Sequence, residues 1–257
     1  MSKCIVFVLF LAACINALPT QSSIGRGTDR VGNLRLSSNT AAYGDYPFMV
    51  TLRYPNDILL SCTGTILNRN WILTAASCVV GIDISDVDIA VGSDAMTFNP
   101  RVRRKACKIR IHPKFSGTKY YLNDIAMILV TEPFKYGKDV APVAIYCGVT
   151  RSNLNVTVVG WRLNNGPPSR VYEFTTRSDC SRVAIKNQIC VKFPKQTVSC
   201  SEDSGSPLLH TNSKAQLGIA SFDKEKCHVE DRVMYTRVAL YVGWMEEVIH
   251  STKLTCA

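Results

Sequence analysis

Short runs of β-branched and aromatic residues recur along the whole chain, and turn-forming residues separate them. Nine such runs have strand character: 48–54, 63–68, 71–76, 88–92, 108–112, 125–130, 154–161, 206–210 and 216–222. Strands at such short intervals favour an all-β barrel or sandwich over alternating strand–helix units. One helix is expected near the C-terminus, at about 238–252, because Val238, Tyr241, Met245 and Val248 recur at spacings of three and four.

The N-terminus has the pattern of a secretory signal. Lys3 precedes an apolar run from Ile5 to Ala13, and small residues lead to Ala17, so we expect a signal peptide at 1–17. That run is too short to span a bilayer, and no longer apolar stretch follows, so a membrane protein is not expected. Residues 18–35 are polar and rich in Gly and Ser, like a leader that need not pack.

The chain holds eleven cysteines, and Cys4 and Cys14 lie in the expected signal. The other nine should mostly pair in an oxidising compartment, which predicts a secreted, extracellular protein. Because nine is odd, one of them is left unpaired or joined to another chain.

The formal net charge is +10, and much of the excess lies in residues 101–114. Such a cluster can attract heparin-like polyanions or acidic protein surfaces. The simpler interpretation is a solvated strand in which Lys108, Arg110 and His112 point outward and the residues between them point inward. No nucleic-acid recognition motif is present, so nucleic acid is not an expected partner.

Three segments, in order, carry the components of nucleophilic serine catalysis. CTGTILNRNWILTAASC covers 62–78, LNDIAMILV covers 122–130 and supplies an acid ahead of a buried strand, and CSEDSGSPLL at 200–209 supplies a hydroxyl in an Asp-Ser-Gly turn. Together they resemble the chymotrypsin and trypsin family of serine proteases. The resemblance begins at Tyr46-Pro47 and covers about four-fifths of the chain.

The resemblance implies a trypsin-like domain at 36–257, built from two packed six-stranded antiparallel β-barrels and a C-terminal α-helix. The first barrel is expected at about 36–140, a crossover at about 138–153, the second barrel at about 154–238 and the helix at about 238–252. No cofactor or metal is implied.

Carried over by the resemblance, Asp124 matches the triad acid and Ser204 the nucleophile, but the histidine position holds Ser77. A serine hydroxyl has no accessible basic form near neutral pH, so Ser77 cannot take the proton from Ser204. We therefore expect a degenerate triad and a pseudoprotease rather than an enzyme.

Only four histidines exist in the chain: His112, His210, His228 and His250. By the resemblance, His112 lies on an outer strand, His210 follows the nucleophile strand and His250 ends the helix. His228, next to Cys227, lies on a loop near the cleft and is the one conceivable substitute base. The alternative function is thus a serine hydrolase with a rearranged mechanism.

Further departures affect the oxyanion and specificity sites. Glu202 stands where the family has a glycine, so its side chain penalises positive φ and puts a carboxylate beside the developing anion. The pocket floor is Val198, and the family's wall glycines align with Asp223 and Val233, so the pocket should be occluded. Ordinary core packing of Val198 and Val233 is compatible with this, because a filled pocket is core.

The expected activation site also departs from the family's pattern. No Ile-Val-Gly-Gly-type N-terminus is present to pair with Asp203, and neither Arg30 nor Arg35 has the family's spacing as a cleavage site.

The resemblance assigns three disulfides, Cys62 with Cys78, Cys180 with Cys190, and Cys200 with Cys227. It does not place Cys107, Cys147 or Cys256, although pairing of Cys107 with Cys256 would suit a terminal helix that packs back near the first barrel. Asn155-Val156-Thr157 is a glycosylation sequon, but sequons at strand starts are often unused.

Among inactive homologues, the Ser-for-His change and the TAASC context at 74–78 look most like the scabies mite inactivated serine protease paralogues. That resemblance implies a secreted parasite protein that binds host extracellular proteins and interferes with host defence, such as complement. A polyanion-binding module using residues 101–114 is a third hypothesis.

Overall fold

The computed structural model of the chain describes residues 39–40, 44–54, 57–92, 100, 102–118, 121–148, 154–162, 170–177, 187–192, 204–221 and 232–256. The signal peptide expected at 1–17 and the leader expected at 18–35 lie outside these residues. The strands are β1 (Asn39–Thr40), β2 (Met49–Tyr54), β3 (Asp57–Ile66), β4 (Trp71–Thr74), β5 (Asp88–Val91), β6 (Val102–Ile111), β7 (Ala126–Val130), β8 (Asn155–Arg162), β9 (Arg170–Arg177), β10 (Gln188–Lys192), β11 (Pro207–His210), β12 (Gln216–Ser221) and β13 (Arg232–Arg237). Three short 3-10 turns, η1 (Ala76–Cys78), η2 (Ile84–Asp86) and η3 (Val238–Tyr241), and one helix, α1 (Val242–Ser251), complete the described elements.

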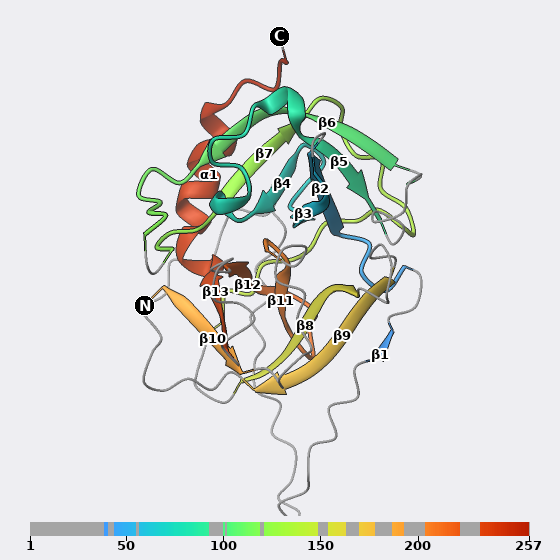
Figure 1. The fold of residues 1–257 in the computed structure, drawn as a ribbon, viewed down its shortest axis with the longest axis vertical. Coiled ribbons are helices and arrows are strands. Elements are labelled where there is room, and N and C mark those ends of the chain that lie inside the picture. The colour runs from blue at the N-terminus through green and yellow to red at the C-terminus, as the bar shows by residue number, and fades with distance from the viewer. Residues whose placement is uncertain are drawn as a thin grey trace, which may run out of the picture.

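The first half of the chain forms a closed antiparallel barrel in the order β2-β3-β4-β7-β6-β5 (Figure 1). Every residue of β4 and β7 is buried, and Trp71 pairs with Leu129 in their ladder. Apolar side chains on both strands therefore pack inside the molecule, as the continuous apolar runs predicted.

The second half forms a seven-stranded antiparallel sheet in the order β1-β9-β8-β11-β12-β13-β10. The expected all-β fold class is confirmed, and among the described strands this sheet has seven strands where the sequence predicted six. Its hydrogen-bonded ladder is a curled half-barrel, and β1 from the N-terminal side of the first barrel pairs with β9, Asn39 opposite Glu173. The added strand satisfies backbone groups on β9 that an edge would expose.

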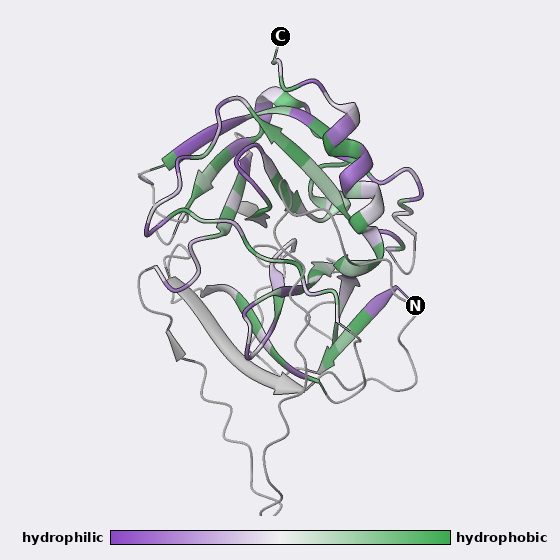
Figure 2. Cartoon of the chain, turned by 180° about the vertical axis from the view of Figure 1, so that it is seen from behind, coloured by the Kyte–Doolittle hydropathy of each residue, from purple (hydrophilic) through white to green (hydrophobic). Residues whose placement is uncertain are grey.

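The helix lies against the first barrel (Figure 1). Its predicted apolar row is confirmed, because Val238, Tyr241, Met245 and Val248 are all buried. The first turn, η3, is a 3-10 turn, so α1 starts later than expected. Figure 2 shows hydrophilic and hydrophobic residues alternating around α1, as a helix with one packed face requires.

One core cluster joins the two halves. It contains barrel residues and residues of α1 together with Val159, Trp161, Leu209 and Ile219 from the second sheet. A polar link crosses the same seam, where the Thr65 hydroxyl donates to Oε1 of Gln216 at 2.8 Å. Residues from both halves can thus be held in fixed relation at the seam.

Among the described residues, no helix is long and apolar enough to cross a membrane.

Candidate active site

Ser77 lies in the 3-10 turn η1, which directly follows the buried strand β4. Ala75 is extended at φ −77° and ψ 143°, so the chain turns sharply between strand and 3-10 turn. Cys78 anchors the turn through its disulfide to Cys62 on β3. The sequence therefore fixes Ser77 at the end of a rigid barrel strand, half-buried beside the seam.

Asp124 lies opposite Ser77, just before β7, and is fully buried. Asn123, in the left-handed region at φ 55°, turns the chain ahead of it. The amide of Ser77 donates to Oδ1 of Asp124 at 2.7 Å, and the Ser77 hydroxyl donates to Oδ2 at 2.9 Å. The structure thus brings together the two residues that the sequence placed in the degenerate triad.

Ser221, at the end of β12, completes this network. Its hydroxyl donates to Oδ2 of Asp124 at 2.6 Å from the opposite half of the molecule. No motif in the sequence points to this serine as a partner of Asp124, since 97 residues separate the pair. Its only sequence signal is a polar residue at the end of an apolar strand.

Two opposing effects set the pKa of Asp124. Burial raises it from its ordinary value of 3.8, while hydrogen bonds from Ser221, Ser77 and the amide of Ala76 act in the opposite direction. Burial is the larger effect, because these donors carry no positive charge to replace the lost hydration.

Ser204 lies across the seam from this network, in the turn before β11. Its carbonyl accepts from the amide of Thr63 at 2.7 Å, and its side-chain oxygen is 3.6 Å from Sγ of Cys78. The residue is only 2% exposed. Gly205 follows at φ 86°, and a Cβ there would collide with the Thr63 carbonyl, so the turn requires glycine.

None of the described histidines contacts Ser204. The His112 ring packs against Tyr241 and Trp244 near the helix, and the His210 ring stacks on Tyr146 and bonds the Ser213 hydroxyl. His250 is exposed on α1. His228 lies outside the described residues. Within the described part of the chain, Ser204 thus contacts Thr63 and Cys78, and no histidine ring nitrogen lies within hydrogen-bonding distance of its hydroxyl.

Comparison with known proteins decides the family. The family model described as Trypsin matches residues 36–245, most of the chain. The chain belongs to the trypsin family of serine proteases. It is 25% identical over 241 residues to the clotting factor G beta subunit of Tachypleus tridentatus, covering 81% of this chain and 77% of that protein.

Two further comparisons agree. Kallikrein-7 of Homo sapiens is 25% identical over 237 residues, covering 87% of this chain and 90% of that protein. A solved structure of HL collagenase superimposes with a TM-score of 0.68 at 22% identity, covering 85% of this chain and all of that one. This last likeness shows that the fold is trypsin-like.

Of the residues expected at the trypsin-family specificity and oxyanion sites, the structure describes Val233. It lies on β13 opposite Val191, is 5% exposed and packs in the core cluster of the second sheet. Val198, Glu202 and Asp223 lie outside the described residues, as does Asp203. Burial of Val233 accords with a valine that occupies core volume where the family has glycine.

The structure contains two of the expected disulfides, Cys62–Cys78 and Cys107–Cys256. The second ties β6 to the segment after α1. Cys190 is also disulfide-bonded, and so is Cys147, which the sequence analysis left without a partner. Cys180, Cys200 and Cys227 lie outside the described residues, so the remaining pairs stay predictions.

Asn155 begins β8 and is exposed, which leaves its side chain accessible for glycosylation.

Proposed function

We propose that this trypsin-family protein is a secreted pseudoprotease that works by binding other proteins. The observation that supports this most directly is the contact between Ser77 and Asp124. In the family the acid holds a histidine that accepts the nucleophile's proton. Here the acid is satisfied by two serine hydroxyls and backbone amides. Neither hydroxyl can act as a base near neutral pH.

The rate that is lost when a triad member is missing supports the proposal that the protein is inactive. Removal of one triad member lowers the rate by roughly 10⁴ to 10⁶, which corresponds to about 5 to 8 kcal/mol of transition-state stabilisation. Ser204 is also nearly inaccessible, at 2% exposure, which adds a steric obstacle to substrate attack.

Labelling with a small fluorophosphonate tests this proposal, because the probe needs an activated serine but no specificity pocket. The wild-type protein should show no more label than a Ser204→Ala variant, and neither should cleave a diverse peptide library. Ser77→His should gain Ser204-dependent labelling while remaining a poor peptidase. Stoichiometric labelling of the wild type would overturn the proposal, and loss of that label in His228→Ala would identify a rearranged mechanism.

The binding role extends the resemblance to the scabies mite inactivated paralogues, which implies host extracellular proteins, such as complement components, as partners. Exposed loops beside a degenerate cleft are the natural place for new recognition. The turn after η1 presents two apolar side chains there, Val80 at 50% and Ile82 at 38% exposure. We propose that this turn contributes to the contact.

Pull-down from host plasma followed by mass spectrometry tests the partner class, and a complement haemolysis assay tests the consequence. Recovered proteins should be lost with Val80→Ser/Ile82→Ser and kept with Leu254→Ser, which removes an equally exposed apolar side chain near the C-terminus. Recovery of no plasma protein above a bead control would contradict the host-defence role.

A further inference from the structure

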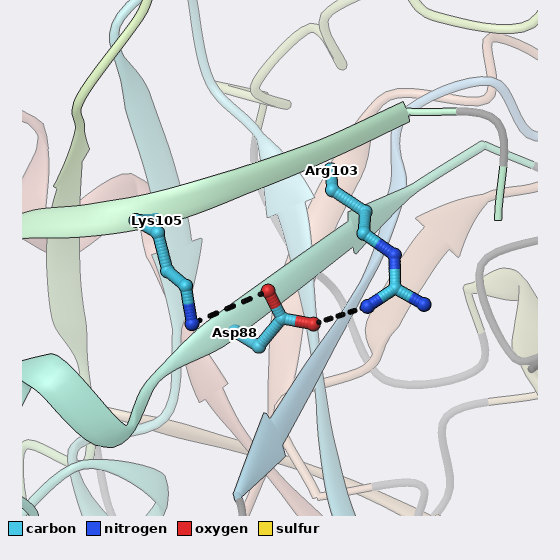
Figure 3. Close-up of polar contacts among 3 residues, drawn as sticks. All are labelled: Asp88, Arg103 and Lys105. Atoms are coloured by element: carbon cyan, nitrogen blue, oxygen red, sulfur yellow. Dashed lines mark hydrogen bonds and ion pairs between the residues drawn. The ribbon is translucent and has the colours of Figure 1, made fainter. Parts of the chain in front are cut away.

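A cluster of charged residues surrounds Asp88 on the outside of the first barrel. Figure 3 shows the Asp88 carboxylate between two cations of β6, with Nη1 of Arg103 at 3.0 Å and Nζ of Lys105 at 3.6 Å. The side chains of Arg103 and Lys105 are 46% and 61% exposed, whereas that of Asp88 is 23% exposed. The acid is therefore set below a rim of accessible positive charge.

Strand register builds this cluster. Asp88 on β5 lies opposite Arg53 of β2 on one side and opposite Lys105 of β6 on the other. The three side chains form one row across the sheet, and Arg103 lies two residues from Lys105, on the same face. Figure 2 shows the same end of β6 as a strongly hydrophilic stretch. The basic segment seen in the sequence is thus arranged around one carboxylate.

The surface here is hollowed, with a volume of about 640 Å³. We call it the Asp88 hollow, and its lining comprises Arg53, Tyr54, Asp88, Arg103, Arg104, Lys105, Thr131 and Glu132. Arg104 is held in place by the carbonyls of Glu132, Pro133 and its neighbour Arg103, and its guanidinium lies over the Phe134 ring. These carbonyl and ring groups hold the Arg104 guanidinium at the hollow without neutralising its charge.

Positive charge exceeds negative charge in the Asp88 hollow, where four cations face two carboxylates. The pKa of Arg53 is lowered by burial and then by the charge of Arg103, while Asp88 acts in the opposite direction. Neighbouring guanidinium groups therefore repel one another, and an anionic ligand would relieve that repulsion.

We propose that the Asp88 hollow binds a sulfated polysaccharide chain. Guanidinium groups match the paired oxygens of sulfate and carboxylate, and three of the four cations are arginines. Asp88 already pairs with Arg103 and Lys105, so a small monovalent anion would gain little binding free energy there. A ligand with repeated charges can displace the Asp88 carboxylate from these cations. The disulfides of the chain fit the oxidising surroundings in which such polymers occur.

The site lies on the barrel strands β2, β5 and β6, its lining includes none of Ser77, Asp124 and Ser204, and it does not depend on whether the protein is inactive. Heparin is the probe for its test. Arg103→Gln/Lys105→Gln should weaken heparin affinity in calorimetry by roughly tenfold to thirtyfold and elute at lower salt from a heparin column.

Lys135→Gln/Lys138→Gln is the matched control, since it removes the same charge from exposed positions outside the hollow. Asp88→Asn should bind more tightly than the wild type, and more tightly than Glu247→Gln, which changes the net charge equally on α1. Three of the four variants alter exposed side chains, and Asp88→Asn alters a partly buried one, so thermal unfolding should confirm that each variant folds intact.

Equal weakening by the two double variants would mean that overall charge, not the hollow, attracts heparin, and would overturn the proposal. Polyglutamate is the competing probe. If it binds as tightly as heparin with the same dependence on Arg103 and Lys105, the surface takes acidic peptides and the proposal is wrong.

Discussion

The hydroxyl of Ser77 lies 2.9 Å from Oδ2 of Asp124 and donates to it. In the function proposed above, Ser77 satisfies the buried acid as the family's histidine would. Its hydroxyl has no basic form near neutral pH and so would not accept a proton from Ser204. The acid has kept its place in the fold and serves as a buried hydrogen-bond acceptor.

This relation predicts a measurable stability effect. Ser77→Ala removes one donor from a buried carboxylate and should lower the free energy of unfolding by about 1.5 to 3 kcal/mol. Ser85→Ala is the matched control, because the Ser85 hydroxyl donates to Asp83 in an exposed 3-10 turn. That variant should change stability by less than about 0.5 kcal/mol. Urea unfolding measures both, and equal effects would show that the Ser77 contact contributes nothing specific.

Asp124 should also give the protein a characteristic pH dependence. Its folded pKa is raised above the ordinary 3.8, so the folded state binds a proton before the unfolded state does. Stability attributable to this group should therefore increase as the pH falls through the folded pKa toward 3.8. Asp124→Asn cannot titrate, so the wild type should gain stability relative to this variant across that window.

Urea unfolding of the wild type and Asp124→Asn at a series of pH values measures this difference. Changes in hydrogen bonding in Asp124→Asn shift its free energy of unfolding by the same amount at every pH. Titration of Asp124 instead makes the difference in free energy between the two proteins change with pH. A difference that stays flat down to pH 4 would contradict a raised pKa.

The turn at Ser204 predicts a strong glycine requirement. Gly205→Ala should lower the free energy of unfolding by roughly 2 to 4 kcal/mol, because φ is positive and the added Cβ would meet the Thr63 carbonyl. Gly243→Ala provides the control in α1, where nothing lies within 4 Å of the new Cβ, and it should stabilise the helix by roughly 0.5 to 1 kcal/mol. In thermal unfolding, Gly205→Ala should therefore have a lower melting temperature than the wild type, and Gly243→Ala a higher one.

The sequence predicted the parts of the fold that have strong apolar runs. β4, β7 and β12 are buried throughout and were all expected. β9, with the sequence RVYEFTTR, was missed because charged and polar residues interrupt its apolar pattern, and β10 and β13 were missed as well. The interpretation of residues 101–114 as a solvated strand is confirmed by β6, although the run with strand character began only at 108; the charged residues of the N-terminal half of β6 lie opposite β5, which carries Asp88.

The candidate site was predictable where the family's order of motifs applies. Ser77 and Asp124 could be paired from the sequence, and the structure places them in contact. Ser221 could not, because a single serine at a strand end carries no sign of the acid it will meet 97 residues away. Contacts made across the seam depend on how the two halves pack, and local patterns do not encode that packing.

His210 should make the stability of the protein depend on pH near neutrality. Its ring stacks on Tyr146 with centroids 4.7 Å apart, and burial lowers its pKa from the ordinary 6.5. The unfolded state therefore binds a proton first as the pH falls below 6.5, and stability should decline from there through the folded pKa. His210→Gln should therefore have a shallower decline in stability between pH 7 and 5 than the wild type. His112, whose pKa is lowered by burial and by Lys114, retains its share of the slope in this variant. Identical slopes for the wild type and His210→Gln in urea unfolding would show that His210 does not carry this dependence.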